Sequence, residues 1–191
     1  MEAIFLDRDG VINRKPPEGK YVATAVDLHF LPGALESIVA LFRSGYSVFI
    51  VTNQRGIARG IMTHRDLEGI HALLHDSVRR RGGQIQKIYV CSHDHHEHCH
   101  CRKPRPGMLL QAKKEYGIDL SASWMIGDSA SDLIAGKQAG CRTAFVDNVT
   151  SNSLLIDADV VGASLAEIAE FIIRQRRGGN LISRYSFDVV H

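Results

Sequence analysis

The sequence of 191 residues contains no long hydrophobic run, no low-complexity tract and no internal repeat. Because no apolar stretch approaches membrane-spanning length, we expect no membrane contact. An apolar run already at residues 3–6 leaves no room for a signal peptide, so we expect a cytoplasmic protein. With one tryptophan and a formal net charge of +2, the chain offers no aromatic and basic track for a nucleic-acid strand. We therefore expect no nucleic-acid partner.

Strand and helix patterns alternate along the chain. Apolar runs predict strands at 3–6, 47–51, 85–91, 123–126, 143–146 and 159–161. Capping residues and apolar spacing predict helices at 33–45, 63–82, 106–117, 128–140 and 164–176. This alternation predicts an α/β fold, with a Rossmann-like, mostly parallel sheet, helices on both faces and no separate cap domain.

The segments between these elements are too short for a second domain. We expect a single domain at 1–177, with the mouth of any site covered only by loops 13–31, 53–62 and 92–105. Residues 178–191 have no helical period, and we expect them to form either a tail or an added strand.

Polar side chains follow four of the predicted strands. They are Asp7 and Asp9 after the first, Thr52 after the second, Lys103 after the third and Asp128 after the fourth. In a parallel sheet these ends meet at one edge, where ligands bind. Two neighbouring carboxylates repel each other unless a cation is shared, which points to Mg²⁺. Carboxylates, a hydroxyl and an ammonium together suit phosphoryl transfer.

In this order the motifs resemble those of the haloacid dehalogenase (HAD) superfamily of phosphotransferases. The matching segments are Asp7-Arg8-Asp9-Gly10, Thr52, Lys103, and Gly127-Asp128 with Asp132. The resemblance implies that Asp7 is a nucleophile that forms an aspartyl-phosphate. It implies that Asp9 starts protonated, protonates the leaving oxygen and then activates water. It further implies that Asp7, the main-chain carbonyl of Asp9 and Asp128 hold Mg²⁺, while Thr52 and Lys103 hold phosphoryl oxygens.

A second metal site is predicted in the loop at 91–103. Cys91, Cys99 and Cys101 fall close together, and three cysteines with one histidine form a closed tetrahedral zinc site. We predict His93 as the fourth ligand, because Cys91-x-His93 repeats the spacing of Cys99-x-Cys101. The alternatives are His95, His96, His98 and His100, or an unstructured metal scavenger. Zinc would fix the direction of the adjoining Arg102 and Lys103.

This zinc loop resembles that of the small zinc-loop phosphatases within the superfamily. Residues 5–10, 52–60 and 101–104 look most like the branch that removes the 7-phosphate of D-glycero-D-manno-heptose 1,7-bisphosphate for lipopolysaccharide or surface-glycan precursors. The resemblance implies a small-molecule sugar bisphosphate as the substrate. It also implies substrate contacts from Asn53, Gln54, Arg55 and Arg102, with the Arg102 guanidinium suited to the second phosphate. The absence of a lid domain leaves room for a partner subunit as a cover, but a monomer is the plainer expectation.

Several alternatives remain at this stage. The chain could be a histidinol-phosphate phosphatase, or a non-catalytic binding protein stabilised by zinc. Ser129 stands where many heptose members have a lysine, and the basic residues of loop 14–20 could replace that charge. Asp132 is either an outer partner of the site or a carboxylate favoured by a helix N-terminus. His71 shows no partner in the sequence, and we expect a surface group or a satisfied core group.

Overall fold

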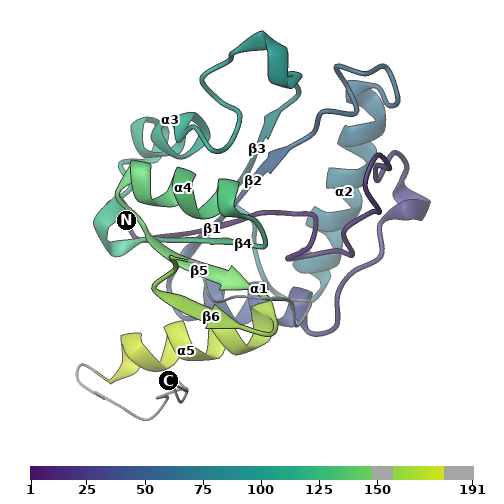
Figure 1. The fold of residues 1–191 in the computed structure, drawn as a ribbon. Coiled ribbons are helices and arrows are strands. Elements are labelled where there is room, and N and C mark those ends of the chain that lie inside the picture. Colours follow the sequence, from purple (N-terminus) through teal and green to yellow (C-terminus); the bar gives the residue numbers. More distant parts are fainter. Residues whose placement is uncertain (148–156, 179–191) are drawn as a thin grey trace, which may run out of the picture.

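The computed structural model describes residues 1–147 and 157–178. Their strands form one six-stranded parallel sheet in the order β3-β2-β1-β4-β5-β6 (Figure 1). The strands are β1 (Ala3–Leu6), β2 (Ser47–Asn53), β3 (Lys87–Cys91), β4 (Trp124–Gly127), β5 (Arg142–Val146) and β6 (Val160–Gly162). The chain moves outward from β1 to β3, returns to β4 on the other side of β1, and continues to β6. This reversal makes the gap between β1 and β4 the switch point of the sheet, where such folds bind ligands.

Helices cover both faces of the sheet, as predicted. They are α1 (Ala34–Arg43), α2 (His64–Arg80), α3 (Gly107–Tyr116), α4 (Ala130–Ala139) and α5 (Leu165–Arg177). Alternate side chains of β1 separate two cores. Ile4 and Leu6 pack with α1, α2 and α5, whereas Phe5 packs with α3 and α4. The two layers are visible above and below the sheet in Figure 1.

The helix starts follow from local hydrogen bonding. Thr63 caps α2 and forms a reciprocal capping box with Asp66, and Ser164 caps α5, both as predicted. Pro106 stands one position earlier than predicted, at the N-cap of α3 rather than in its first turn. Three short 3₁₀ turns, Ala25–Asp27, His95–Glu97 and Leu120–Ala122, were not predicted.

Two strands differ from their predicted bounds in a way that affects the site. β2 continues to Asn53 because Thr52 and Asn53 pair with Val90 and Cys91 of β3. β3 itself begins at Lys87 rather than residue 85, since pairing with β2 starts there. The longer β2 therefore places Asn53 directly beside Cys91, where the predicted zinc loop begins.

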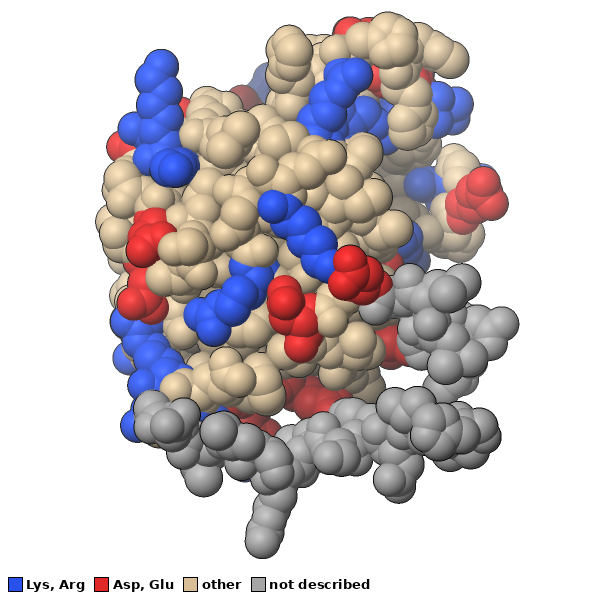
Figure 2. All heavy atoms as spheres, turned by 60° about the vertical axis from the view of Figure 1, so that its left-hand side comes forward, with Lys and Arg blue, Asp and Glu red and all other residues tan. Residues whose placement is uncertain are grey.

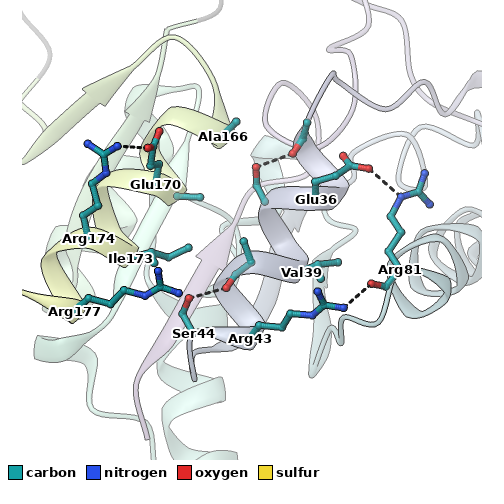
Figure 3. Close-up of a pocket in the computed structure, with 14 residues that line it drawn as sticks. Glu36, Val39, Arg43, Ser44, Arg81, Ala166, Glu170, Ile173, Arg174 and Arg177 are labelled. Atoms are coloured by element: carbon teal, nitrogen blue, oxygen red, sulfur yellow. Dashed lines mark hydrogen bonds and ion pairs between the residues drawn. The ribbon is translucent and has the colours of Figure 1, made fainter.

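One surface groove lies away from the strand ends. This groove of about 870 Å³ runs between α1 and α5, with an apolar floor that includes Val39 and Ile173 and a rim of Arg43, Arg81 and Arg174 (Figure 3). The rim arginines are partly paired, since Arg81 contacts Glu36 and Arg174 contacts Glu170. None of the predicted site residues lines this groove.

The surface carries mixed charge. On the face drawn in Figure 2, basic and acidic side chains are interspersed and form no patch of one sign. Among the described residues, none of the helices is both long and apolar enough to span a membrane. Of the predicted tail at 178–191, residues 179–191 lie outside the described part of the chain.

Candidate active site

The predicted carboxylates meet at the switch point of the sheet. Asp7 directly follows β1, and its amide donates to Ile126 O of β4 over 2.9 Å, which ties the two strand ends together. Asp128 follows β4. Gly10 lets it approach closely, because a Cβ at Gly10 would lie 2.0 Å from Asp128 Oδ2. The left-handed backbone of Gly10, with φ of +91°, also favours glycine.

Lys103 is the buried cation of this cluster. Its Nζ lies 2.9 Å from Asp7 Oδ1 and 2.5 Å from Asp132 Oδ1, and it donates to Val51 O over 2.7 Å. These three contacts use all three hydrogens of the ammonium. Burial alone would lower the pKa of Lys103, but the carboxylates of Asp132 and Asp7 outweigh that effect and raise it. Lys103 is therefore held in its charged form.

The same burial changes the pKa of the Asp7 carboxyl group. Removal from water raises the pKa of Asp7 to about 7, and the adjacent charge of Lys103 opposes this rise without cancelling it. Burial also raises the pKa of Asp128, against the effect of Lys15, whose Nζ lies 2.7 Å from Asp128 Oδ2. Both carboxylates thus lie in surroundings where a further cation would be stabilising.

Asn53 connects β2 to the main chain of Lys103. Its Nδ2 donates to Lys103 O, and its Oδ1 accepts from Lys103 N, each over 3.1 Å. This reciprocal pair fixes the backbone from which the Lys103 ammonium reaches Asp7. Asn53 also lines the pocket over the site, and its predicted contact with substrate stays a prediction.

The carboxylate of Asp9 is held from several sides. Its Oδ1 accepts from Arg8 Nε at 3.1 Å, Arg8 Nη2 at 3.0 Å and Asn13 Nδ2 at 2.8 Å. Its Oδ2 accepts from Arg8 Nη2 at 2.9 Å and Gln54 Nε2 at 3.0 Å. Gln54 Nε2 also donates to Thr52 Oγ1 over 2.8 Å. Gln54, predicted to contact substrate, is only 2% exposed and links Asp9 to Thr52.

The carboxylate oxygens fit a hard divalent cation. Ligand atoms of Asp7, Asp128 and Asp132 all lie within 4.8 Å of one another. Asp128 Oδ1 is buried and has no hydrogen-bond partner in the described part of the molecule, as expected of an oxygen suited to a metal. Asp132 is engaged instead by Lys103 at Oδ1 and by Ser129 N and Oγ at Oδ2. Asp7 and Asp128 are thus the side chains that fit Mg²⁺ best.

The predicted zinc ligands also come together. Ligand atoms of Cys91, His93, Cys99 and Cys101 lie within 4.8 Å of one another, whereas the rival histidines lie outside this cluster. Cys91 Sγ is 3.6 Å from Cys99 Sγ and 3.5 Å from His93 Nδ1, which is 3.2 Å from Cys101 Sγ. A tetrahedral site with the usual zinc–ligand bonds has edges of about 3.5–3.8 Å. The four side chains therefore fit zinc.

Two arginines contact residues of the predicted zinc loop, and only one of them is paired with a carboxylate. Arg102 donates to His93 O over 3.2 Å and to His95 Nδ1 over 3.3 Å. The charge of Arg102 is the main cause that lowers the pKa of His95, so this partner is neutral and leaves the guanidinium charge uncompensated. Arg55 Nε lies 2.7 Å from Asp94 Oδ1, so its charge is paired. Arg102 is therefore the stronger candidate for binding an anion.

Loops and strand ends enclose a pocket of about 430 Å³ over these groups. Its lining includes Asp7, Asp9, Thr52, Lys103 and Asp128 at its floor, with loop 15–22, Arg55, His95 and Arg102 around it. As predicted, no inserted domain covers the described site. The pocket is open enough for a small phosphorylated molecule.

Four contributing residues were missed or left undecided by the sequence analysis. Arg8 and Asn13 hold Asp9, and Lys15 contacts Asp128. Asp132 fills both of the roles considered for it, since it forms the capping box of α4 with Ser129 and also binds Lys103. The alternation of β1 could have placed Arg8 opposite Asp7, whereas the sequence indicated only that some basic residue of loop 14–20 could serve the site, and the structure places Lys15 against Asp128.

Comparison with known proteins gives consistent matches. A HAD-hydrolase-like family model matches residues 100–168. A D-glycero-β-D-manno-heptose-1,7-bisphosphate 7-phosphatase of Pseudomonas aeruginosa is 41% identical over 75% of this chain and 79% of that protein. A protein of the same description from Bordetella bronchiseptica is 34% identical over 92% of this chain and 99% of its own.

A solved structure of the B. bronchiseptica D,D-heptose 1,7-bisphosphate phosphatase, complexed with magnesium and phosphate, has the same fold. Its TM-score is 0.85, at 34% identity, over 92% of this chain and 99% of that chain. The parallel sheet, the carboxylates at its switch point and these matches define a phosphatase of the HAD-like hydrolase class. Within that class, the chain belongs to the family of these heptose-bisphosphate phosphatases.

Proposed function

We propose that this phosphatase removes the 7-phosphate of D-glycero-β-D-manno-heptose 1,7-bisphosphate during synthesis of lipopolysaccharide or surface-glycan precursors. The similarity to relatives that carry this substrate in their names supports the choice. The observation that carries the chemistry is the cluster of Asp7, Asp9, Lys103 and Asp128 at one end of the sheet. We also propose that the enzyme is monomeric and cytoplasmic.

In the first step, a carboxylate oxygen of Asp7 attacks the phosphorus of the 7-phosphate. The bond between phosphorus and the sugar oxygen breaks, and Asp9 gives its proton to that oxygen as the alcohol leaves. When bound by Asp7, Asp128 and the Asp9 carbonyl, Mg²⁺ would neutralise charge on the carboxylates and the phosphoryl group. Arg8 already lies beside Asp9 to stabilise the carboxylate that remains.

In the second step, Asp9 takes a proton from water as the water oxygen bonds to phosphorus. The bond between phosphorus and Asp7 breaks, and inorganic phosphate leaves. One hydrogen of Lys103, bonded to Asp7 in this structure, becomes available to a phosphoryl oxygen once Asp7 is esterified. The hydroxyl of Thr52, which accepts from Gln54, keeps its own hydrogen to donate to another oxygen.

The 1-phosphate would lie at the mouth of the pocket near Arg102 and Lys15. The charge of Arg102 is not compensated by its contacts with His93 O and His95, because both partners are neutral. Ser129 supplies no charge, because its side chain is a neutral hydroxyl, which donates to Asp132. Lys15 approaches Asp128 from the neighbouring loop and brings a cation to this end of the site. These two cations suit a doubly phosphorylated sugar better than a monophosphate.

The test is phosphate release, with Mg²⁺, from the β-heptose bisphosphate and from histidinol phosphate. We expect kcat/KM to favour the bisphosphate by about tenfold or more, which corresponds to about 1.4 kcal/mol in the transition state. The Asp7→Asn variant should be inactive on both. A preference for histidinol phosphate would overturn the proposed substrate, and an active Asp7→Asn variant would overturn the proposed mechanism.

A further inference from the structure

Arg8 is an arginine in a fully buried position, which is unusual for a charged side chain. It is 0% exposed and belongs to the largest fully buried side chains of the described residues. By strand alternation, Arg8 lies on the same face as Ile4 and Leu6, which is the face covered by α2. An arginine is rarely buried in this way without partners that compensate its charge.

The guanidinium of Arg8 is held along two edges. Nε and Nη2 face the Asp9 carboxylate, and Nη2 also donates to Gln54 Oε1 over 3.2 Å. On the other edge, Nη1 lies 3.5 Å from Nε2 of His71, which α2 contributes. Because a guanidinium only donates, His71 Nε2 must be the acceptor and the ring proton must lie on Nδ1. His71 thus has the partner that its sequence did not reveal.

The imidazole of His71 is suited to this contact. Burial is the main cause that lowers the pKa of His71 to about 3, and the charge of Arg8 lowers it further. The ring is therefore neutral at physiological pH and can accept from the guanidinium. A protonated ring would place two cations edge to edge in a buried position.

Resting on the proposed function, we propose that Arg8 and His71 form a positioning pair for the proton transfer by Asp9. The contacts from Nε and Nη2 of Arg8 fix the plane of the Asp9 carboxyl group. His71 in turn prevents the guanidinium from rotating away, although it touches neither Asp9 nor the pocket. Small errors in the placement of a reacting group are costly to rate, so such support has a measurable effect.

Two phosphate esters test this proposal without the heptose substrate. The alkyl ester β-glycerophosphate needs a proton on its leaving oxygen, whereas p-nitrophenyl phosphate releases a stable anion with much less help. The value of kcat/KM depends on the steps up to departure of the leaving group. The ratio of the two values therefore measures how much the reaction depends on the proton from Asp9. A merely structural defect would lower both values together.

The variants are His71→Leu, His71→Gln and Arg8→Lys, with His75→Leu as the control one turn further along α2. We expect His71→Leu to lower kcat/KM on β-glycerophosphate by about tenfold, with a much smaller loss on p-nitrophenyl phosphate. His71→Gln, whose amide oxygen can accept from Arg8, should restore most of the loss. Arg8→Lys should show a larger selective loss, and His75→Leu none.

Equal losses on both esters, or an unchanged His71→Leu variant in a folded enzyme, would overturn the positioning role. Folding is checked for each variant by thermal melting followed by circular dichroism. Asp7→Asn is measured beside them, because residual activity in that variant would contradict the proposed mechanism itself. Failure of the positioning pair and failure of the proposed function are thus separate results.

Discussion

Individual side chains at the end of β2 and just after it hold other groups of the site in place. Asn53 fixes the main chain of Lys103, Gln54 joins Asp9 to Thr52, and Arg55 pairs with Asp94 of the zinc loop. All three also line the pocket, so the substrate contacts expected from the sequence stay predictions. Their order after a strand is visible in the sequence, but their partners come from distant loops, which local patterns cannot show.

Lys15 offers a direct test of how a second phosphate is bound. We predict that Lys15→Gln raises KM for the heptose 1,7-bisphosphate by about tenfold or more, because a hydrogen bond to a charged group is typically worth about 1.5–3 kcal/mol and about 1.4 kcal/mol corresponds to a factor of ten. KM for the corresponding 7-monophosphate should change little. Lys114→Gln, an exposed substitution on α3 with the same change in net charge, is the control. Equal effects on both substrates would contradict this role for Lys15.

His71 also makes stability depend on pH. Its pKa is about 3 in the folded protein and 6.5 as the ordinary value, so the unfolded chain binds more protons between these limits. The free energy of unfolding should therefore rise with pH between about 3 and 6.5. The stabilising contribution of the neutral His71 ring should be complete above pH 6.5. The slope from this one group is at most about 1.4 kcal/mol per pH unit.

Urea unfolding at several pH values between 5 and 7 measures this slope. His71→Gln should show a shallower dependence than the unchanged protein in the same buffers, because glutamine does not titrate. Identical slopes for the two proteins would show that the His71 ring is not held neutral by the fold.

At the level of elements, the predicted zinc loop connects the cluster of cysteines and His93 to the active-site pocket. It begins at Cys91 at the end of β3, and it ends at Arg102 and Lys103. The spacing of its ligands sufficed to predict the cluster with His93. Its contact to the neighbouring loop through Asp94 and Arg55 was not predictable, because charge pairs between loops leave no pattern in sequence.

Removal of zinc should therefore disturb the Mg²⁺-dependent reaction. In excess Mg²⁺, a zinc-selective chelator should lower kcat by about tenfold or more and lower the melting temperature, and added zinc should restore both. Cys99→Ser should lose the zinc measured by elemental analysis. Cys141→Ser, a buried cysteine outside the cluster, should retain it. Full activity after complete zinc removal would contradict a positional role for the loop.

Across the whole molecule, the alternation of strands and helices predicted the parallel sheet and its two layers of helices. The order of the strands brings Asp7 and Asp128 to either side of the switch point, so the sequence motifs and the topology agree on one location. The approach of loop 14–20 to Asp128 depends on tertiary packing, which periodicity does not encode. The groove between α1 and α5 also depends on tertiary packing, and the sequence analysis did not predict it.

The most direct test of this account is to find where the phosphoryl group is held during turnover. The protein and its Asp9→Asn variant are mixed with Mg²⁺ and p-nitrophenyl phosphate, whose leaving anion needs little help from the Asp9 proton. The mixtures are quenched in acid, digested and examined by mass spectrometry. We predict phosphoryl transfer to Asp7, with a larger trapped fraction in Asp9→Asn because water is no longer activated. Phosphorylation of another residue, or turnover by Asp7→Asn, would contradict the proposed site.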